Sequence, residues 1–152
     1  MKIFIAFLAP PALPSLIRET GSYSGREGMN EEEIPMTKHE ILRVLDHILD
    51  PDLRNRSIVE MGFVREEDIE VKEEEIQVFY TVGGPLCPYS AAVGIIIHHT
   101  LSEKFHKKIK VRMKAGHYQQ DIVNQILQDE SQFNEWFEKI KSQKLLEICL
   151  RA

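Results

Sequence analysis

The stretch IQVFYTVGGPLCPYSAAVGIIIHHTLSEKFHKKIKVRM, residues 76–113, decides the fold. Apolar and polar residues alternate from Ile76 to Val82, which predicts a half-buried strand. The apolar run that follows, over about 88–105, is long enough for a buried helix. Alternation returns over 107–115, which predicts a second half-buried strand. A helix between two strands is the βαβ pattern, so a small sheet covered by helices is expected.

The residues before this stretch predict one helix and one further strand. Thr37 and Glu40 form a capping box, and apolar residues at helical spacing then predict a helix over 37–49. The segments 58–64 and 68–82 are interpreted as two strands of a hairpin that reverses around the charged residues 72–75.

Helical spacing begins again at Tyr118 and continues past Trp136 in two further helices. The predicted order is therefore helix, strand, strand, helix, strand, helix, helix. This order indicates an α+β, two-layer fold with a small three-stranded mixed sheet covered by helices.

Length and composition indicate one globular domain. The chain has 152 residues, of which 43% are hydrophobic and 28% charged, and its net charge is −5. These values argue against wholesale disorder, against a membrane-embedded body and against nonspecific attraction to polyanions. Two cysteines without a CxxC pair are too few for a disulfide framework, so we expect a cytoplasmic protein.

The first 36 residues are interpreted as a leader or linker, either disordered or belonging to a wrongly assigned start. An apolar run near the N-terminus is broken by prolines, and the segment 21–35 is rich in Gly, Ser and Glu without periodicity. Met29 and Met36 are alternative starts. A single domain is expected over 37–152.

Cys87 lies in the loop GGPLCPYS, residues 83–90, between the predicted strand and the buried helix. Pro88 suits the first position of a helix, which makes Cys87 the expected N-cap and favours its thiolate. Gly83 and Gly84 would allow unusual backbone angles, and Pro85 completes the loop. The alternative is a tight turn with a packed, unreactive cysteine.

Four stretches of the chain are recognisable as motifs: DPDLRNRSIVEMGFV (50–64), TVGGPLCPYSAAV (81–93), AGHYQQDIVNQILQDE (115–130) and KLLEIC (144–149). Together they resemble the metal-sulfur cluster assembly family, whose members include SufT, PaaD and the cytosolic iron–sulfur assembly targeting factors. The resemblance covers about residues 37–150. The matching motif positions are Asp50, Pro51 and Asp52, then Glu60 to Val64 including Gly62, then Pro85, Cys87 and Pro88, and finally His117. Glu60 replaces the usual Asp, and Gly83 stands where a Thr is common.

The resemblance implies a maturation factor for iron–sulfur proteins rather than an enzyme. Its partners would be iron–sulfur client proteins and other assembly factors, with a homodimer as a further expectation and no membrane. Cys87 would be the functional thiol and a transient metal ligand. Typical clusters need four protein ligands, so any cluster carried by Cys87 would be labile or completed by another chain.

Four other residues are candidate ligands or proton carriers near Cys87: Asp50, Asp52, Glu60 and His117. Each also has a structural interpretation. The two aspartates would shape a turn, Glu60 would be a solvated charge at a strand edge, and His117 would cap the following helix. Cys149 is a secondary candidate, for which packing or a partner contact is favoured over metal.

Two other classes of function stay open. A cysteine-nucleophile enzyme would use Cys87 activated by His117, with an acid such as Asp121 to orient the imidazole. A nucleic-acid-binding module would use the basic residues of 104–114, although their alternation with apolar residues also fits the wet face of a strand, and no aromatic residue is interleaved for stacking on bases.

Overall fold

The computed structural model describes residues 36–150. The expectations for the leader therefore lie outside the described residues. The chain from Met36 onward forms one compact unit.

A three-stranded mixed sheet lies at the centre of this unit, in the order β2-β3-β4. Strand β2 (Ile69–Val71) pairs antiparallel with β3 (Glu75–Tyr80), and β3 pairs in parallel with β4 (Lys108–Met113). Val78 is in register with Val111. The parallel pair is connected through helix α4 (Ser90–Lys104), as the βαβ pattern predicts. The predicted fold class is confirmed.

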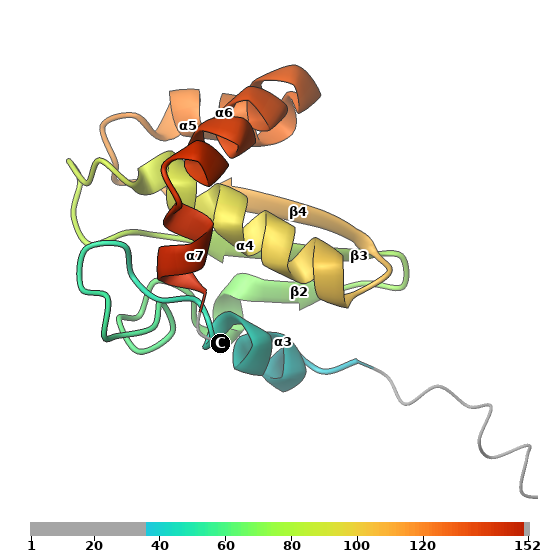
Figure 1. Cartoon of the computed structure of the whole chain (residues 1–152). Helices are drawn as coiled ribbons and strands as arrows, with labels where there is room; N and C mark the ends of the chain where they lie inside the picture. The colour runs from blue at the N-terminus through green and yellow to red at the C-terminus, as the bar shows by residue number, and fades with distance from the viewer. Residues whose placement is uncertain (1–35, 151–152) are drawn as a thin grey trace, which may run out of the picture. The chain divides into compact units, whose positions relative to one another are not determined.

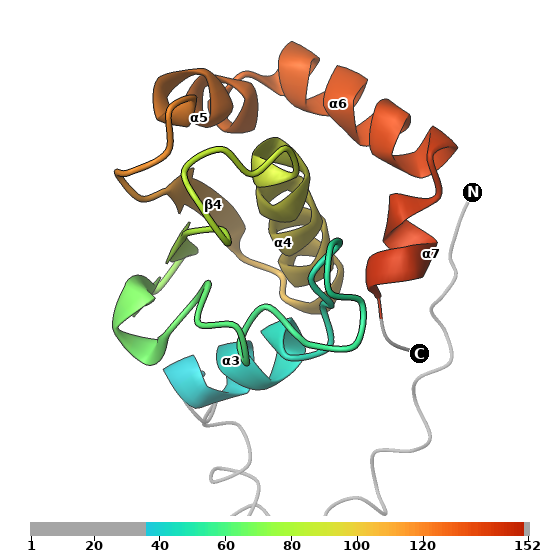
Figure 2. The same cartoon turned by 90° about the vertical axis from the view of Figure 1, so that its left-hand side faces the viewer.

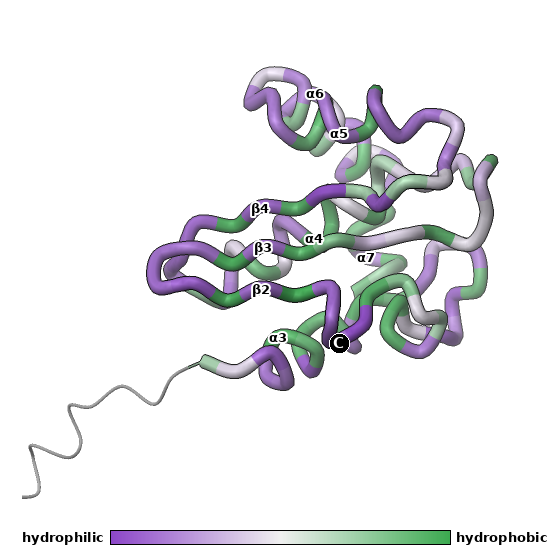
Figure 3. The backbone as a smooth tube through the Cα atoms, turned by 180° about the vertical axis from the view of Figure 1, so that it is seen from behind, coloured by the Kyte–Doolittle hydropathy of each residue, from purple (hydrophilic) through white to green (hydrophobic). Residues whose placement is uncertain are grey.

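Helix α4 covers one face of the sheet (Figure 1). Alternate residues of β3 and β4 are buried beneath it, and their neighbours lie on the opposite face, which none of the described helices covers (Figure 3). Residues 90–97 of α4 are all buried, because the sheet lies on one side of this helix and other helices lie on the rest. No helix in the described part of the chain has both the length and the apolar character needed to cross a membrane.

Helix α3 (Lys38–Leu45) begins at the predicted capping box. The side chain of Thr37 accepts from the Glu40 N–H, and the Glu40 side chain accepts from the Thr37 N–H. The predicted end at residue 49 is wrong, because Ile48 and Leu49 leave the helix. Ile48 forms an isolated β-bridge with Leu150, which ties the two ends of the unit together, and Leu49 forms one with Ser57.

The segment 58–64 is a series of turns, so the strand predicted there is wrong. Its apolar residues Ile58, Phe63 and Val64 are buried, but in a coil that leads to the short helix η1 (Glu66–Asp68). Both strands of the hairpin come from 68–82, and they reverse around 72–75 as predicted.

Three helices complete the unit: α5 (Gln120–Gln128), α6 (Glu130–Ser142) and the short α7 (Leu145–Cys149). Helix α6 runs beside α4 (Figure 2). Phe133 and Phe137 of α6 contact the rings of His98 and His99, with centroids 4.7 and 5.0 Å apart. Lys144 adopts a left-handed conformation, with φ at 60°, at the turn between α6 and α7.

Candidate functional site

The loop 81–89 joins β3 to α4 and carries Cys87. Cys87 is partly buried and packs against the core. Its backbone N–H donates to the Gly84 carbonyl at 3.2 Å, which closes a turn. Cys87 therefore lies in a closed turn, partly exposed to solvent and partly packed against the core.

The segment 117–118 fixes this loop from outside. The Tyr118 N–H donates to the carbonyl of Pro85 at 3.2 Å. The imidazole of His117 is buried, and its Nε2 lies 3.1 Å from the carbonyl oxygen of Cys87. Two hydrogen bonds thus join the residues around Cys87 to the start of the C-terminal helices.

The hydrogen bonds of His117 define its tautomer. Its Nδ1 lies 3.0 Å from the backbone nitrogen of Gln119, and a backbone N–H can only donate. Nδ1 must therefore accept, so the proton of the neutral ring is on Nε2 and is donated to the Cys87 carbonyl. His117 thus binds the N–H of Gln119, the residue that precedes α5.

Cys87 is not the N-cap of α4, contrary to the sequence prediction. The helix begins at Ser90 and Tyr89 is its N-cap, with no side-chain capping bond. An N-cap residue gives its own carbonyl to the first helical hydrogen bond. The Cys87 carbonyl bonds to His117 instead, and the Tyr89 carbonyl accepts from Val93. Pro88 accordingly lies in the turn before the helix.

The two glycines of the loop do not adopt the unusual backbone angles expected of them. Neither Gly83 nor Gly84 has a positive φ. A Cβ at Gly83 would only touch the ring of Phe63, at 3.9 Å, and a Cβ at Gly84 would meet nothing within 4 Å. Among the described residues, the glycines with positive φ are Gly62 (φ 79°) and Gly116 (φ 121°), and the second of these immediately precedes His117.

Tyr80, at the end of β3, lies beneath the loop and is fully buried. Its hydroxyl donates to the Ser90 carbonyl at 2.7 Å. Burial raises the pKa of this phenol well above its ordinary value, a hydrogen bond with the backbone of Gly94 opposes the rise, and the charge of Cys87 adds to it. The Tyr80 hydroxyl therefore stays protonated in the folded chain and holds the first turn of α4.

Asp50 and its neighbours serve the turn that follows α3. Asp50 is buried, and its two carboxylate oxygens accept from the backbone N–H groups of Asp52 and Leu53, each at 3.3 Å. The carbonyl of Pro51 accepts from the side chain of Arg54. This arrangement fits the structural interpretation of Asp50, and the carboxylate of Asp52 is left in solvent.

Glu60 caps a turn and does not lie at a strand edge. Its carboxylate accepts from the Ser57 N–H at 2.8 Å, and the Ser57 hydroxyl accepts from the Glu60 N–H at 3.0 Å. Gly62 follows in its left-handed conformation. Phe63 then reaches the base of the Cys87 loop, where its carbonyl accepts from the Thr81 N–H at 2.9 Å.

Cys149 is fully buried in α7. Burial and the nearby charge of Asp50 raise the pKa of its thiol to about 11, and Arg54 opposes the rise. Its carbonyl accepts from the Leu49 N–H. Of the two interpretations favoured for Cys149, packing or a partner contact, this burial fits packing.

The candidate residues thus fall into separate places. His117 and the Phe63 turn lie beside the Cys87 loop, whereas Asp50 lies with Cys149. In the part of the chain that the structure describes, no three His, Cys, Asp or Glu side chains are grouped so that they could hold a metal ion.

Exposed apolar side chains lie on the Cys87 loop and on the segment bonded to it, and the sequence analysis missed them. Leu86 is 72% exposed and Tyr118 is 66% exposed, and the Pro85–Tyr118 hydrogen bond brings their segments together. Ile122 of α5 is 56% exposed. We call Leu86 and Tyr118 the loop patch. Only the burial of their neighbours distinguishes these residues, and that is not visible in one sequence.

No protein-family model matches this chain, and no curated protein matches it.

Proposed function

We propose that this chain is a maturation factor for iron–sulfur proteins, which contacts its clients through the loop patch and engages their cluster or its precursor through the thiol of Cys87. The observation that carries the proposal is the setting of Cys87. A partly exposed thiol lies on an anchored loop beside two strongly exposed apolar side chains, Leu86 and Tyr118. Exposed apolar side chains that cluster on a folded domain often mark a protein-binding surface.

The motif resemblance supplies the kind of client, and the ligand chemistry limits how a cluster is held. A resident cluster does not fit the described residues near Cys87. The ring of His117 is occupied at both nitrogens, and the carboxylate of Glu60 is occupied by its capping box. A cluster needs four protein ligands as a rule. It is therefore proposed as cargo, with Cys87 giving one thiolate and the partner giving the others.

The alternative of a cysteine-nucleophile enzyme finds less support in this geometry. A general base must reach the thiol proton, but the acceptor nitrogen of His117 is used by the Gln119 N–H. No hydrogen bond in the described chain joins His117 to the sulfur of Cys87. We therefore place the role of His117 in holding the loop.

Anaerobic reconstitution with ferrous iron and sulfide tests the thiol. Iron content and visible absorbance are compared between the native chain, Cys87→Ser and Cys149→Ala. The native chain and Cys149→Ala should retain iron after desalting in the presence of an apo iron–sulfur client, and Cys87→Ser should not. Equal iron in all three chains would refute the role of Cys87.

Binding to purified apo iron–sulfur proteins tests the loop patch separately. Leu86→Ser and Tyr118→Ser should weaken the binding. Leu53→Ser is the matched control, because Leu53 is also an exposed leucine, at 49%, but lies in the 50–57 turn. Unchanged binding in both loop-patch variants would show that clients dock elsewhere.

A further inference from the structure

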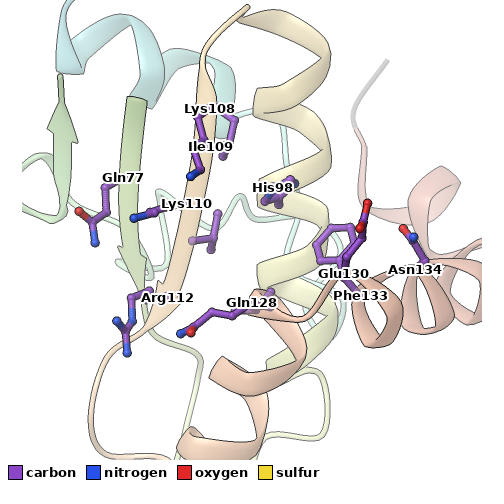
Figure 4. Close-up of a pocket in the computed structure, with 12 residues that line it drawn as sticks. Gln77, His98, Lys108, Ile109, Lys110, Arg112, Gln128, Glu130, Phe133 and Asn134 are labelled. Atoms are coloured by element: carbon purple, nitrogen blue, oxygen red, sulfur yellow. The ribbon is translucent and has the colours of Figure 1, made fainter. Parts of the chain in front are cut away.

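A groove runs between the outer edge of β4 and the helices α5 and α6 (Figure 4). Its volume is about 570 Å³, which lies within the range of roughly 300–1,000 Å³ that is usual for ligand sites. Figure 4 shows Gln77, Lys110 and Arg112 on the sheet side of the groove, and His98 and Phe133 on the helix side. None of these residues belongs to the Cys87 loop.

Within the described part of the chain, Val111 of β4 presents its backbone to this groove without a hydrogen-bonding partner. The N–H groups of Lys108 and Lys114 donate to Glu74 and Tyr80, so the even-numbered residues of β4 bond toward β3. The N–H and carbonyl groups of the odd-numbered residues point toward the outer edge, because the backbone groups of successive residues in a strand point to opposite sides.

Asn124 of α5 closes one end of this edge. Its side-chain amide accepts from the Met113 N–H at 2.7 Å and donates to the Met113 carbonyl at 3.3 Å, as a neighbouring strand would. Among the described residues no such group reaches the N–H and carbonyl of Val111. Backbone groups at a buried position need a hydrogen-bonding partner, and an extended chain beside this edge would supply one to Val111.

Cations line the sheet side of the groove. Lys108, Lys110 and Arg112 are exposed and follow one another at every second position of β4. Only Lys110 has an ion pair in the described chain, with Glu75 at 3.6 Å. Alternate residues of a strand are roughly 6.7 Å apart, so the carboxylates of alternate residues in an adjacent extended peptide would face these cations one by one.

The helix side of the groove is less polar. Leu127 and Phe133 are partly buried there, beside His98. The residues of an adjacent strand that point away from the cations would meet this wall. Glu130 is the one acidic residue among the described residues of the lining, so positive charge predominates there.

A second copy of this chain does not fit the same edge. Pairing β4 with the β4 of another copy would place the three cations of each strand against those of the other, and like charges directly opposite each other destabilise a sheet. The charge of the edge instead requires an acidic occupant.

We propose that the β4 groove binds an extended acidic segment of a partner protein, in which acidic residues alternate with apolar ones. The segment adds to the sheet as a short strand and pairs with the Val111 backbone. Its carboxylates face Lys108, Lys110 and Arg112, and its apolar side chains face Leu127 and Phe133. This interaction does not depend on the thiol of Cys87.

The test measures binding of a fluorescein-labelled seven-residue peptide that alternates glutamate with valine, by fluorescence anisotropy with the full chain. Arg112→Glu should weaken binding roughly fivefold or more, since it exchanges an attraction for a repulsion. Lys38→Glu is the matched control, with the same change of charge on an exposed lysine at the start of α3, and it should bind normally. In nuclear magnetic resonance spectra, the Val111 amide should shift and exchange more slowly with the peptide bound.

Each other outcome overturns the proposal. Absence of binding would refute the site. Equal binding of a peptide with lysine in place of glutamate would show that charge plays no part, and equal binding of a peptide with a central proline would show that backbone pairing plays none. Tighter binding of oligothymidylate, lost in Arg112→Glu, would assign the groove to nucleic acid. Iron is absent from this experiment, so its failure would leave the proposed function to its own test.

Discussion

His117 donates from Nε2 to the carbonyl of Cys87 across 3.1 Å. Its hydrogen bond is therefore made to the backbone of the cysteine and not to its sulfur. Its other nitrogen accepts from Gln119. One buried ring therefore links the loop before α4 to the start of α5. The hydrogen bond to the Cys87 carbonyl holds this residue in a fixed, partly exposed position.

Replacement of His117 by alanine should free this loop. Two hydrogen bonds are lost, and the Cys87 carbonyl and Gln119 N–H lose their partner, which should cost about 1–3 kcal/mol in the free energy of unfolding. Urea denaturation measures the loss, and hydrogen exchange should become faster at the Tyr118 amide. His106→Ala, at an exposed histidine, is the control and should change neither quantity. An unaltered exchange rate at Tyr118 would contradict the anchoring role.

Gly94→Ala should destabilise the chain through Tyr80. A Cβ at Gly94 would lie 2.5 Å from the Tyr80 hydroxyl oxygen and 2.8 Å from the ring carbon that bears it, and Tyr80 is too well packed to move away. Overpacking of this kind typically costs about 1–3 kcal/mol. Gly84→Ala is the matched control, because open space surrounds that position. Thermal unfolding compares the two, and equal midpoints would show that Tyr80 can move aside.

The sequence patterns that predicted the fold correctly are those in which the residue types favour the local backbone conformation that forms. Alternation in β3 and β4, the apolar run of α4 and the capping box of α3 are each explained by neighbours close in sequence. The segment 58–64 was misread because its apolar residues are buried in turns, and burial without a regular period resembles a short strand.

The site was less predictable, because contacts between distant segments decide it. Pro88 lies in the turn before α4 and not at its first position, and the hydrogen bond from His117 takes the carbonyl that an N-cap at Cys87 would need. Ile122 continued the helical pattern, yet it is exposed because no described element covers that side of α5. Neither effect has a signature within a few residues.

His98 should make the stability of the chain depend on pH. Burial lowers the pKa of this histidine below its ordinary value of 6.5, the nearby His99 lowers it further, and a hydrogen bond with the Ile109 backbone opposes them. Below about pH 6.5 the unfolded chain therefore binds a proton that the folded chain does not, so stability is lost as the pH falls. His98→Phe should lose less stability than the native chain between pH 7 and pH 5, by urea denaturation. Parallel curves for the two chains would contradict this assignment.

Cys149 should be inert in the folded chain and should lower its stability at high pH. Its pKa is about 11 when folded, against an ordinary 9.0, because burial and Asp50 disfavour the thiolate. The protonated thiol is favoured by folding, so its contribution is complete below pH 9 and is lost as the pH rises through 11. The loss is at most roughly 2.7 kcal/mol. Cys149→Ala removes this dependence, while Tyr80 titrates in both chains and cancels in the comparison.

Iodoacetamide at about pH 8 should modify only Cys87 in the folded native chain and both cysteines in denaturant. Modification of Cys149 at the rate of Cys87 without denaturant would show that α7 opens readily, and the interior position of this thiol would then have to be abandoned.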